Sequence, residues 1–366
     1  MNSKTESAPS ELTFSATESG VGSEELLRSI KEILTEGGSH NADLFSREHW
    51  NWQYKSLPAN RSGVFTCMVE NKIAGYYHAP FYEGQIKGEK KLFAVVQDVA
   101  VKNELRGKGV FRKLAEYSTS QLLASGANLI YTFPNDKSIH TFLKYDGYKT
   151  VCSYDTFLLP VKFSEIIKSR ISLAGIEKLI GSVADIFFKR NFRLTQEEKI
   201  TVWQDFDDDT AGFFNRFAAS FPISRTRSKE YLKWRYSDRP GTKYFILILS
   251  SANKISAAAV FKCDKIFGVN AALLLDFAFE NERDIAKLIH YVKANSLQVF
   301  NIQVGLIFTA FCCNRFLKNK KYGFVKVPKR LNPRPVNLLV KNISEEESLL
   351  MNSSNWFATL GDWDVF

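Results

Sequence analysis

The sequence is poor in the residue patterns that build disulfide frameworks and metal sites. Its 366 residues include five cysteines, an odd number with no Cys-x-x-Cys pair, and five histidines without metal-ligand spacing. Most of the cysteines lie in apolar runs, as the buried thiols of a reducing compartment do. We therefore expect no disulfide, no bound metal and a cytoplasmic protein. The cysteines are Cys67, Cys152, Cys263, Cys312 and Cys313.

Signals for membranes, secretion and nucleic acids are missing as well. No uncharged apolar stretch approaches the length of a membrane span, and the N-terminus is polar and acidic, unlike a secretory signal. The net charge is +10, but the basic residues are scattered and form no known nucleic-acid-binding motif. We expect no transmembrane segment and no specific nucleic-acid partner. An anionic small ligand or an anionic membrane surface is consistent with the charge.

What the sequence does contain is a globular composition and one turn rich in glycine and positive charge. Apolar residues make up 45% of the chain, and its length allows two domains. Residues 92–101 predict a buried strand, and an amphipathic helix is predicted from residue 110. Between them, two glycines let backbone N–H groups surround an anion at a helix N-terminus. The predicted phosphate-binding turn consists of Arg106, Gly107, Lys108, Gly109 and Val110.

The turn does not fit every phosphate-binding pattern. The dinucleotide pattern needs three glycines, and the ATP-binding P-loop needs Ser or Thr after its Gly-Lys pair; neither is present. The segment resembles the acetyl-CoA loop of the GNAT superfamily of N-acetyltransferases, Arg/Gln-x-x-Gly-x-Gly/Ala. Arg106 and Gly109 match its first two fixed positions, whereas Phe111 stands where the family has a small residue.

The resemblance extends over residues 64–159. A second buried strand is predicted at 128–133, and Asn135, a short helix and the pair Gly147-Tyr148 follow in the family's order. The resemblance implies acetyl-CoA as the acyl donor. It also implies that the strand before the turn holds the pantetheine and the developing oxyanion through its backbone. The further implied cofactor contacts are Val99, Ala100, Val101, Phe111 and Asn135.

The chain also contains a long internal repeat. The segment SREHWNWQYKSLP at 46–58 matches SKEYLKWRYSDRP at 228–240, and matches continue downstream with small deletions. A repeat of this length indicates a duplicated domain. The matching pairs include Trp52 and Trp234, Tyr54 and Tyr236, Pro58 and Pro240, and Asp98 and Asp276.

The second copy lacks the phosphate-binding turn. The segment after Asp276 has no glycine and contains the acids Glu280, Glu282 and Asp284, which would repel a phosphate. We therefore predict one cofactor site per chain, in the first copy.

We predict an α/β (α+β) fold of two tandem GNAT-like domains, each a mixed, mostly antiparallel sheet flanked by helices. The predicted parts are a disordered tail (1–9), an acetyl-CoA-binding domain (10–160), a helical inter-domain connection (161–194) and a second GNAT-like domain without the cofactor loop (195–366). Helical periodicity in the connection favours helices packed between the domains. A basic amphipathic segment that touches a membrane is the alternative.

Asp98 is the candidate general base, because the attacking amine must lose a proton. It stands inside an apolar strand, where a carboxylate should bind a proton more tightly than in water. The alternative is a structural role, because Asp276 occupies the same place in the copy that lacks the turn.

The other site residues are less sharply defined. The family often places a tyrosine acid on the helix before Gly147, but Leu143 holds that position, so water or Tyr131 could protonate the thiolate. Tyr77 and His78, on a predicted strand, could line the acceptor pocket or belong to the core. We expect Tyr77, His78 and Tyr131 as the candidate acceptor-binding residues.

The sequence thus predicts an acetyl-CoA-dependent N-acyltransferase in which a small amine attacks the thioester directly in a ternary complex. Tandem members of the family suggest an amino sugar or an amino acid derivative as the acceptor. One alternative is a non-catalytic CoA-binding sensor or scaffold. Another is an aminoacyl-tRNA-dependent transferase of the same tandem fold, which would not need the turn.

Overall fold

The computed structural model divides into two units, which are described separately. The first comprises residues 1–152, 238–240 and 337–352, and the second comprises residues 153–237, 241–336 and 353–366. The predicted tail 1–9 and residues 169–193 of the predicted connection lie outside the described residues. Described are residues 12–18, 24–36, 46–136, 138–168, 194–312, 322–328, 330, 332, 335–341 and 346–363.

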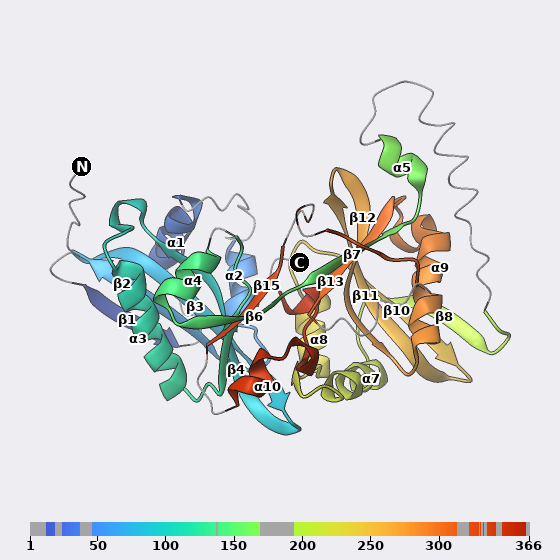
Figure 1. Cartoon of the computed structure of the whole chain (residues 1–366), viewed down its shortest axis with the longest axis horizontal. Coiled ribbons are helices and arrows are strands. Elements are labelled where there is room, and N and C mark those ends of the chain that lie inside the picture. The colour runs from blue at the N-terminus through green and yellow to red at the C-terminus, as the bar shows by residue number, and fades with distance from the viewer. Residues whose placement is uncertain are drawn as a thin grey trace. The chain divides into compact units, whose positions relative to one another are not determined.

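The first unit is a mixed sheet flanked by helices (Figure 1). Its strands are β1 (Thr13–Glu18), β2 (Ser62–Val69), β3 (Lys72–Ile86), β4 (Glu89–Val101), β5 (Leu129–Thr132), β6 (Tyr148–Ser153) and β15 (Asn337–Lys341). Its helices are α1 (Glu24–Glu36), α2 (Arg47–Tyr54), α3 (Val110–Ala124), α4 (Ile139–Tyr145) and α10 (Glu347–Met351). The strand order is β1-β2-β3-β4-β5-β15-β6, in which β4 and β5 are parallel and the pairs from β1 to β4 are antiparallel.

Two separate cores cover the two faces of this sheet, because neighbouring strand residues point to opposite sides. Tyr77 on β3 belongs to the cluster that contains Leu114 of α3. Tyr76, its neighbour, belongs to the cluster that contains Ile30 of α1 and Trp50 of α2. Helix α3 therefore lies on one face of the sheet, and α1 and α2 lie on the other.

The second unit repeats this architecture (Figure 1). Its strands are β7 (Asp155–Pro160), β8 (Glu198–Trp203), β9 (Ile223–Arg225), β10 (Tyr244–Ser251), β11 (Lys254–Ile266), β12 (Val269–Phe279), β13 (Leu306–Phe311), β14 (Val325–Lys326) and β16 (Trp356–Phe357). Its helices are α5 (Phe163–Lys168), α7 (Asp208–Ala219), α8 (Lys229–Tyr236) and α9 (Glu282–Phe300). The strand order is β14-β7-β13-β12-β11-β10-β8, and only β12 and β13 are parallel among the pairings of this sheet that the structure describes. The predicted fold class is confirmed.

The hairpin turns show the repeat in the backbone. Glu70 and Asn71, between β2 and β3, have φ of 51° and 61°, and Ala252 and Asn253, between β10 and β11, have φ of 47° and 63°. Two consecutive left-handed residues form the turn that matches the twist of a tight hairpin. The two hairpins of the repeat thus have the same turn conformation.

Each sheet contains a strand from the other half of the repeat. Two consecutive strands go to different sheets: β6 stays in the first sheet, while β7 pairs with β13 in the second. Conversely, β15 from the C-terminal half pairs with β5 in the first sheet. Each unit is therefore assembled from separate stretches of sequence. Residue 160, the expected domain boundary, is the last residue of β7, which belongs to the second sheet.

Candidate active site

The predicted pantetheine residues lie where β4 and β5 stop pairing. The parallel ladder ends at the pair Val96–Thr132. Just beyond it, Asp98 is the extra residue of a bulge opposite β3, with φ of 23°. Residues 99–101 pair with β3 alone among the described strands. The edge of β4 that would face β5 is therefore left for another partner.

The turn after β4 presents an uncapped helix N-terminus beside cations. Gly107 and Gly109, with φ of 78° and 77°, adopt the left-handed backbone that other residues seldom take. Gly109 is the N-cap of α3, no side chain caps the helix there, and the first turn carries no acid. Arg106 is exposed, and its Nε donates to the carbonyl of Val101 at 3.2 Å. Unbonded N–H groups and positive charge at a helix start favour a bound phosphate.

The corresponding turn of the second unit is closed by its own side chains. Asn281 is the N-cap of α9, and its side chain accepts a hydrogen bond from the Arg283 N–H at 3.1 Å. Glu282 and Asp284 stand in the first turn, and the Asn281 amide also donates to Asp284. A phosphate would have to displace the cap and approach two carboxylates, so the geometry favours α3 over α9 as a phosphate site.

Asp98 is half-buried and bonded to a tyrosine of α2. The Tyr54 hydroxyl donates to Asp98 Oδ2. The Tyr54 ring is 3% exposed and packs edge-on against Trp50 and His78, with centroid distances of 4.2 and 3.5 Å. Burial first, and then the charge of Asp98, raise the pKa of Tyr54 well above its ordinary value. The phenol therefore keeps its proton and acts as a donor at neutral pH.

The three candidate acceptor residues are enclosed in the first unit. Tyr77 is 0% exposed, and its hydroxyl donates to Asp146 at 3.1 Å. His78 is equally buried; its Nε2 lies 2.6 Å from the Ser62 hydroxyl, and burial lowers its pKa well below the ordinary value. Tyr131 is 2% exposed and packs edge-on against two phenylalanines. All three side chains are buried, and their direct contact with an acceptor stays a prediction.

The remaining predicted residues surround α4. The Asn135 side chain accepts from the N–H of Ser138 at 3.0 Å, and Ser138 is the N-cap of that helix. Phe111 is half-buried and packs edge-on against Phe142, with a centroid distance of 6.0 Å, so its bulk lies between α3 and α4. Leu143, where the family often has its acid, is 38% exposed.

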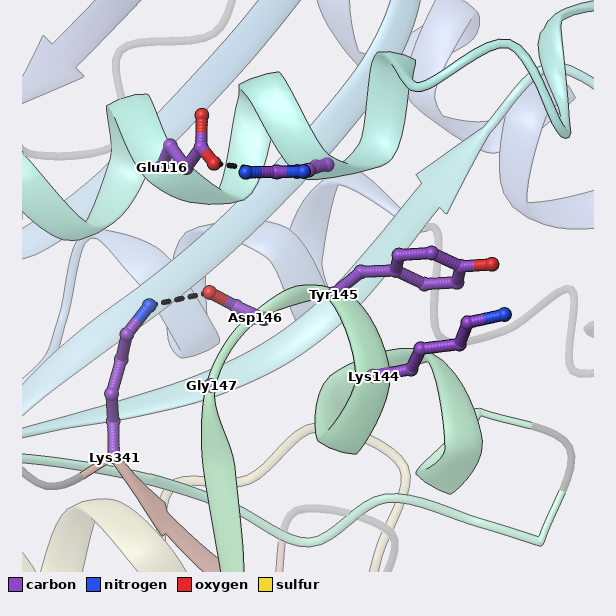
Figure 2. A pocket seen from close by; sticks show the side chains of 7 residues that line it. Glu116, Lys144, Tyr145, Asp146, Gly147 and Lys341 are labelled. Atoms are coloured by element: carbon purple, nitrogen blue, oxygen red, sulfur yellow. Dashed lines mark hydrogen bonds and ion pairs between the residues drawn. The ribbon is translucent and has the colours of Figure 1, made fainter.

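A pocket of about 380 Å³ lies between α3, the end of α4 and β15 (Figure 2). Its charges are largely paired: Arg112 and Glu116 are 2.8 Å apart, and Lys341 bonds to the buried Asp146 (Figure 2). Because Arg112 is in the first turn of α3, the pocket borders the predicted phosphate turn. Its lining residues are Arg112, Glu116, Lys144, Tyr145, Asp146, Gly147 and Lys341.

Sequence reasoning missed Tyr54, Asp146 and Lys341 as parts of the site. Tyr54 carried a usable signal, because the repeat matches it with Tyr236 in the same way that it matches the two aspartates. Lys341 reaches Asp146 only because β15 pairs with β5, and no local pattern announces that pairing.

Comparisons with known proteins agree with this geometry. Residues 31–150 match the family model described as an acetyltransferase (GNAT) domain. No curated protein matches the sequence. The family match thus lies within the first unit, which contains the turn and the parted strands.

Solved structures share the fold at low identity. A probable N-acyltransferase from Enterococcus faecalis V583, described as a conserved protein of unknown function, has a TM-score of 0.61 at 13% identity over 90% of this chain and 72% of its own. A GCN5-related N-acetyltransferase from Anabaena variabilis has a TM-score of 0.58 at 10% identity, over 89% and 72%. N-myristoyltransferase from Saccharomyces cerevisiae with bound myristoyl-CoA has a TM-score of 0.59 at 12% identity, over 93% and 87%. These likenesses establish a tandem fold that acyltransferases use.

Two kinds of feature are absent from the described part of the chain. None of its helices is long and apolar enough to cross a membrane. Its His, Cys, Asp and Glu side chains form no group that could hold a metal ion. Cys67, a candidate buried thiol, is 0% exposed, and burial raises its pKa to about 11.

Proposed function

We propose that the chain is an N-acyltransferase that uses acetyl-CoA as donor and a small primary amine as acceptor. The observation that carries the proposal is the contrast between the two turns: Gly109 leaves α3 uncapped beside the parted strands, whereas Asn281 caps α9. The CoA pyrophosphate would bind at residues 106–111, and the pantetheine would run along residues 99–101 toward Asn135. We assign cofactor binding to the first copy (10–160) and place the reaction in the cytoplasm.

In the proposed reaction the amine nitrogen attacks the thioester carbonyl carbon. As the C–N bond forms, the carbonyl oxygen gains negative charge, which backbone N–H groups of residues 99–101 would stabilise. Asp98 takes a proton from the amine, and the C–S bond breaks. The CoA thiolate leaves and takes a proton from water, so no side-chain acid is needed at Leu143.

Product analysis tests this function directly. The protein is incubated with acetyl-CoA and a panel of amino sugars, amino acids and simple amines, and acylated products are identified by mass spectrometry. Because one structural relative is described with bound myristoyl-CoA, that donor is tested in parallel. We expect an acetylated amine with the natural chain and none with Gly109→Glu. Absence of acetyl-CoA binding to the natural chain would refute the proposal.

A non-catalytic CoA-binding role is the second candidate. It is favoured by Leu143 at the usual acid position and by the Tyr–Asp pair that recurs in the unit without the turn. In that case the protein binds acetyl-CoA tightly but yields no product with any amine of the panel. Calorimetry beside the product assay separates the two candidates.

A further inference from the structure

The two units contain the same tyrosine–aspartate pair at the same place in the fold. Tyr54 is the last residue of α2, and its hydroxyl donates to Asp98. Tyr236 is the last residue of α8, and its hydroxyl lies 3.2 Å from Asp276 Oδ2. Both helices begin with a serine whose side chain caps them, so the duplication has preserved the element that aims each phenol.

The surroundings of the two carboxylates differ. Asp276 is 0% exposed, and its Oδ2 lies 2.8 Å from Nε of the equally buried Arg227. Asp98 is only half-buried, beside the unpaired edge of β4. Asp98 is therefore partly exposed to solvent, whereas Asp276 is fully buried in an ion pair.

Tyr54 is held in a fixed direction. Its ring is packed between Trp50 and His78, and the His78 ring stacks parallel to Tyr76 at 6.0 Å. His78 and Tyr76 are both buried and, like Tyr54, are held in their neutral forms by burial.

We propose that Tyr54 is a positioning residue, which holds one carboxylate oxygen of Asp98 so that the carboxylate faces the acceptor amine at the thioester. The proposal rests on the proposed function, in which Asp98 is the general base. In the second unit the same pair, joined by Arg227, has become a purely structural cluster. The two copies thus differ in the role of this carboxylate, which is reactive at Asp98 and structural at Asp276.

The test compares Tyr54→Phe with the natural chain. Loss of a hydrogen bond to a charged group should lower kcat about tenfold and move the acidic limb of the kcat/KM profile up by about one pH unit. The KM for acetyl-CoA should stay unchanged, because Tyr54 is buried and is not among the predicted cofactor contacts. The assay uses acetyl-CoA and the amine selected by the panel.

A second readout needs no acceptor. In protein labelled with [4-¹³C]aspartate, the Asp98 carboxyl resonance is identified by its absence from Asp98→Asn, and its titration should move to higher pH in Tyr54→Phe. The matched control is Tyr236→Phe, which should lower the melting temperature and leave the acidic limb in place. Tyr54→Phe with an unchanged Asp98 titration and an unchanged rate profile would overturn the proposal. Failure of the proposed function would appear separately, as absent acetyl-CoA binding in the natural chain.

Discussion

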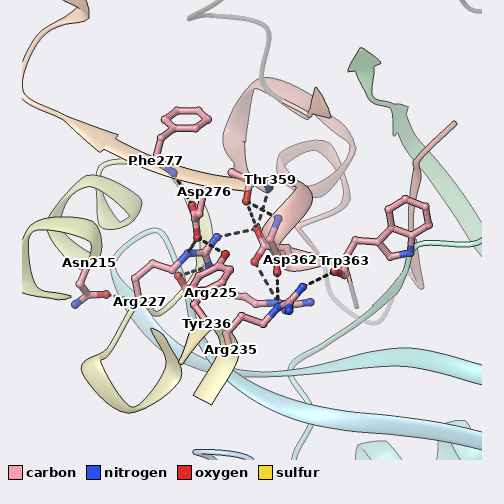
Figure 3. Close-up of polar contacts among 11 residues, drawn as sticks. Asn215, Arg225, Arg227, Arg235, Tyr236, Asp276, Phe277, Thr359, Asp362 and Trp363 are labelled. Atoms are coloured by element: carbon pink, nitrogen blue, oxygen red, sulfur yellow. Dashed lines mark hydrogen bonds and ion pairs between the residues drawn. The ribbon is translucent and has the colours of Figure 1, made fainter. Parts of the chain in front are cut away.

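Replacement of Arg227 by methionine is expected to destabilise the second unit strongly. Its guanidinium is 0% exposed and lies 2.8 Å from both Asp276 Oδ2 and Asp362 Oδ2 (Figure 3). Methionine fills similar space but leaves Asp276 buried without the Arg227 cation. Asp362 keeps Arg225, whose Nε lies 3.5 Å from its Oδ1. Removing one partner of a buried ion pair costs about 3–5 kcal/mol. At about 2–4 °C per kcal/mol, the melting temperature should fall by roughly 6–20 °C.

The loss should depend on pH in a direction that can be worked out. Burial raises the pKa of Asp276 more than Arg227 lowers it, whereas for Asp362 the guanidinium groups of Arg227 and Arg225 outweigh burial and lower the pKa. In Arg227→Met both carboxyl pKa values rise. A raised folded-state pKa gives full stability below the unfolded-state pKa and loses it as the pH rises through the folded-state value. The variant should therefore recover part of its stability between about pH 8 and pH 5.

Denaturant unfolding followed by circular dichroism at both pH values measures this effect. The control is Lys229→Met, which breaks an ion pair of similar length, 3.0 Å to Asp208, at a largely exposed site and should change little. A double variant, Arg227→Met with Asp276→Asn, should regain part of the loss, because it removes one of the two uncompensated carboxylates. A variant as stable as the control, or one whose loss is equal at both pH values, would refute the reasoning about buried charge.

Three further predictions concern the site. Calorimetric titration with acetyl-CoA should reach one equivalent per chain, because α9 is capped by Asn281 and acidic; two equivalents would contradict this. Gly109→Glu should abolish acetyl-CoA binding. Gly109→Ala introduces the same left-handed strain of about 1–2 kcal/mol without the charge, so it should retain much of the binding. Equal affinities in the two variants would refute the electrostatic argument. Asp98→Asn should lower kcat on the order of 10²-fold with little change in acetyl-CoA affinity, as measured by steady-state kinetics, and a normal rate would leave Asp98 structural.

Local patterns predicted the segment around the Gly107–Gly109 turn well. The strand expected at 92–101 lies within β4, the helix expected from residue 110 is α3, and Gly109 adopts the left-handed backbone that a turn needs. These features depend on neighbours in sequence: an apolar run, a residue without Cβ and a helical apolar spacing. The same reasoning located β5 and α4.

Contacts between distant segments were beyond local patterns. The sequence did not predict that β7 joins the second sheet and β15 the first. Both have the composition of an ordinary apolar strand, and the choice of partner depends on which sheet edge remains open. The consequence is chemical as well as topological, since Lys341 of β15 supplies the counter-charge of the buried Asp146. A single turn can be read from sequence, but a pocket assembled from three elements cannot.

The repeat makes the role of Asp98 a question that the chain itself can answer. A carboxylate needed only to fix a strand bulge would serve equally well in both copies. Asp276 shows the environment of such a structural carboxylate: it is fully buried, it forms an ion pair with Arg227, and it accepts a hydrogen bond from the Phe277 N–H at 3.0 Å. Asp98 keeps the tyrosine but is half-buried and stands beside the unpaired strand edge. Burying a charged group is costly, and the partial exposure of Asp98 lowers that cost. The position of Asp98 beside the open edge of β4 makes it a candidate base. The same position therefore also lowers the cost of placing a carboxylate inside an apolar strand.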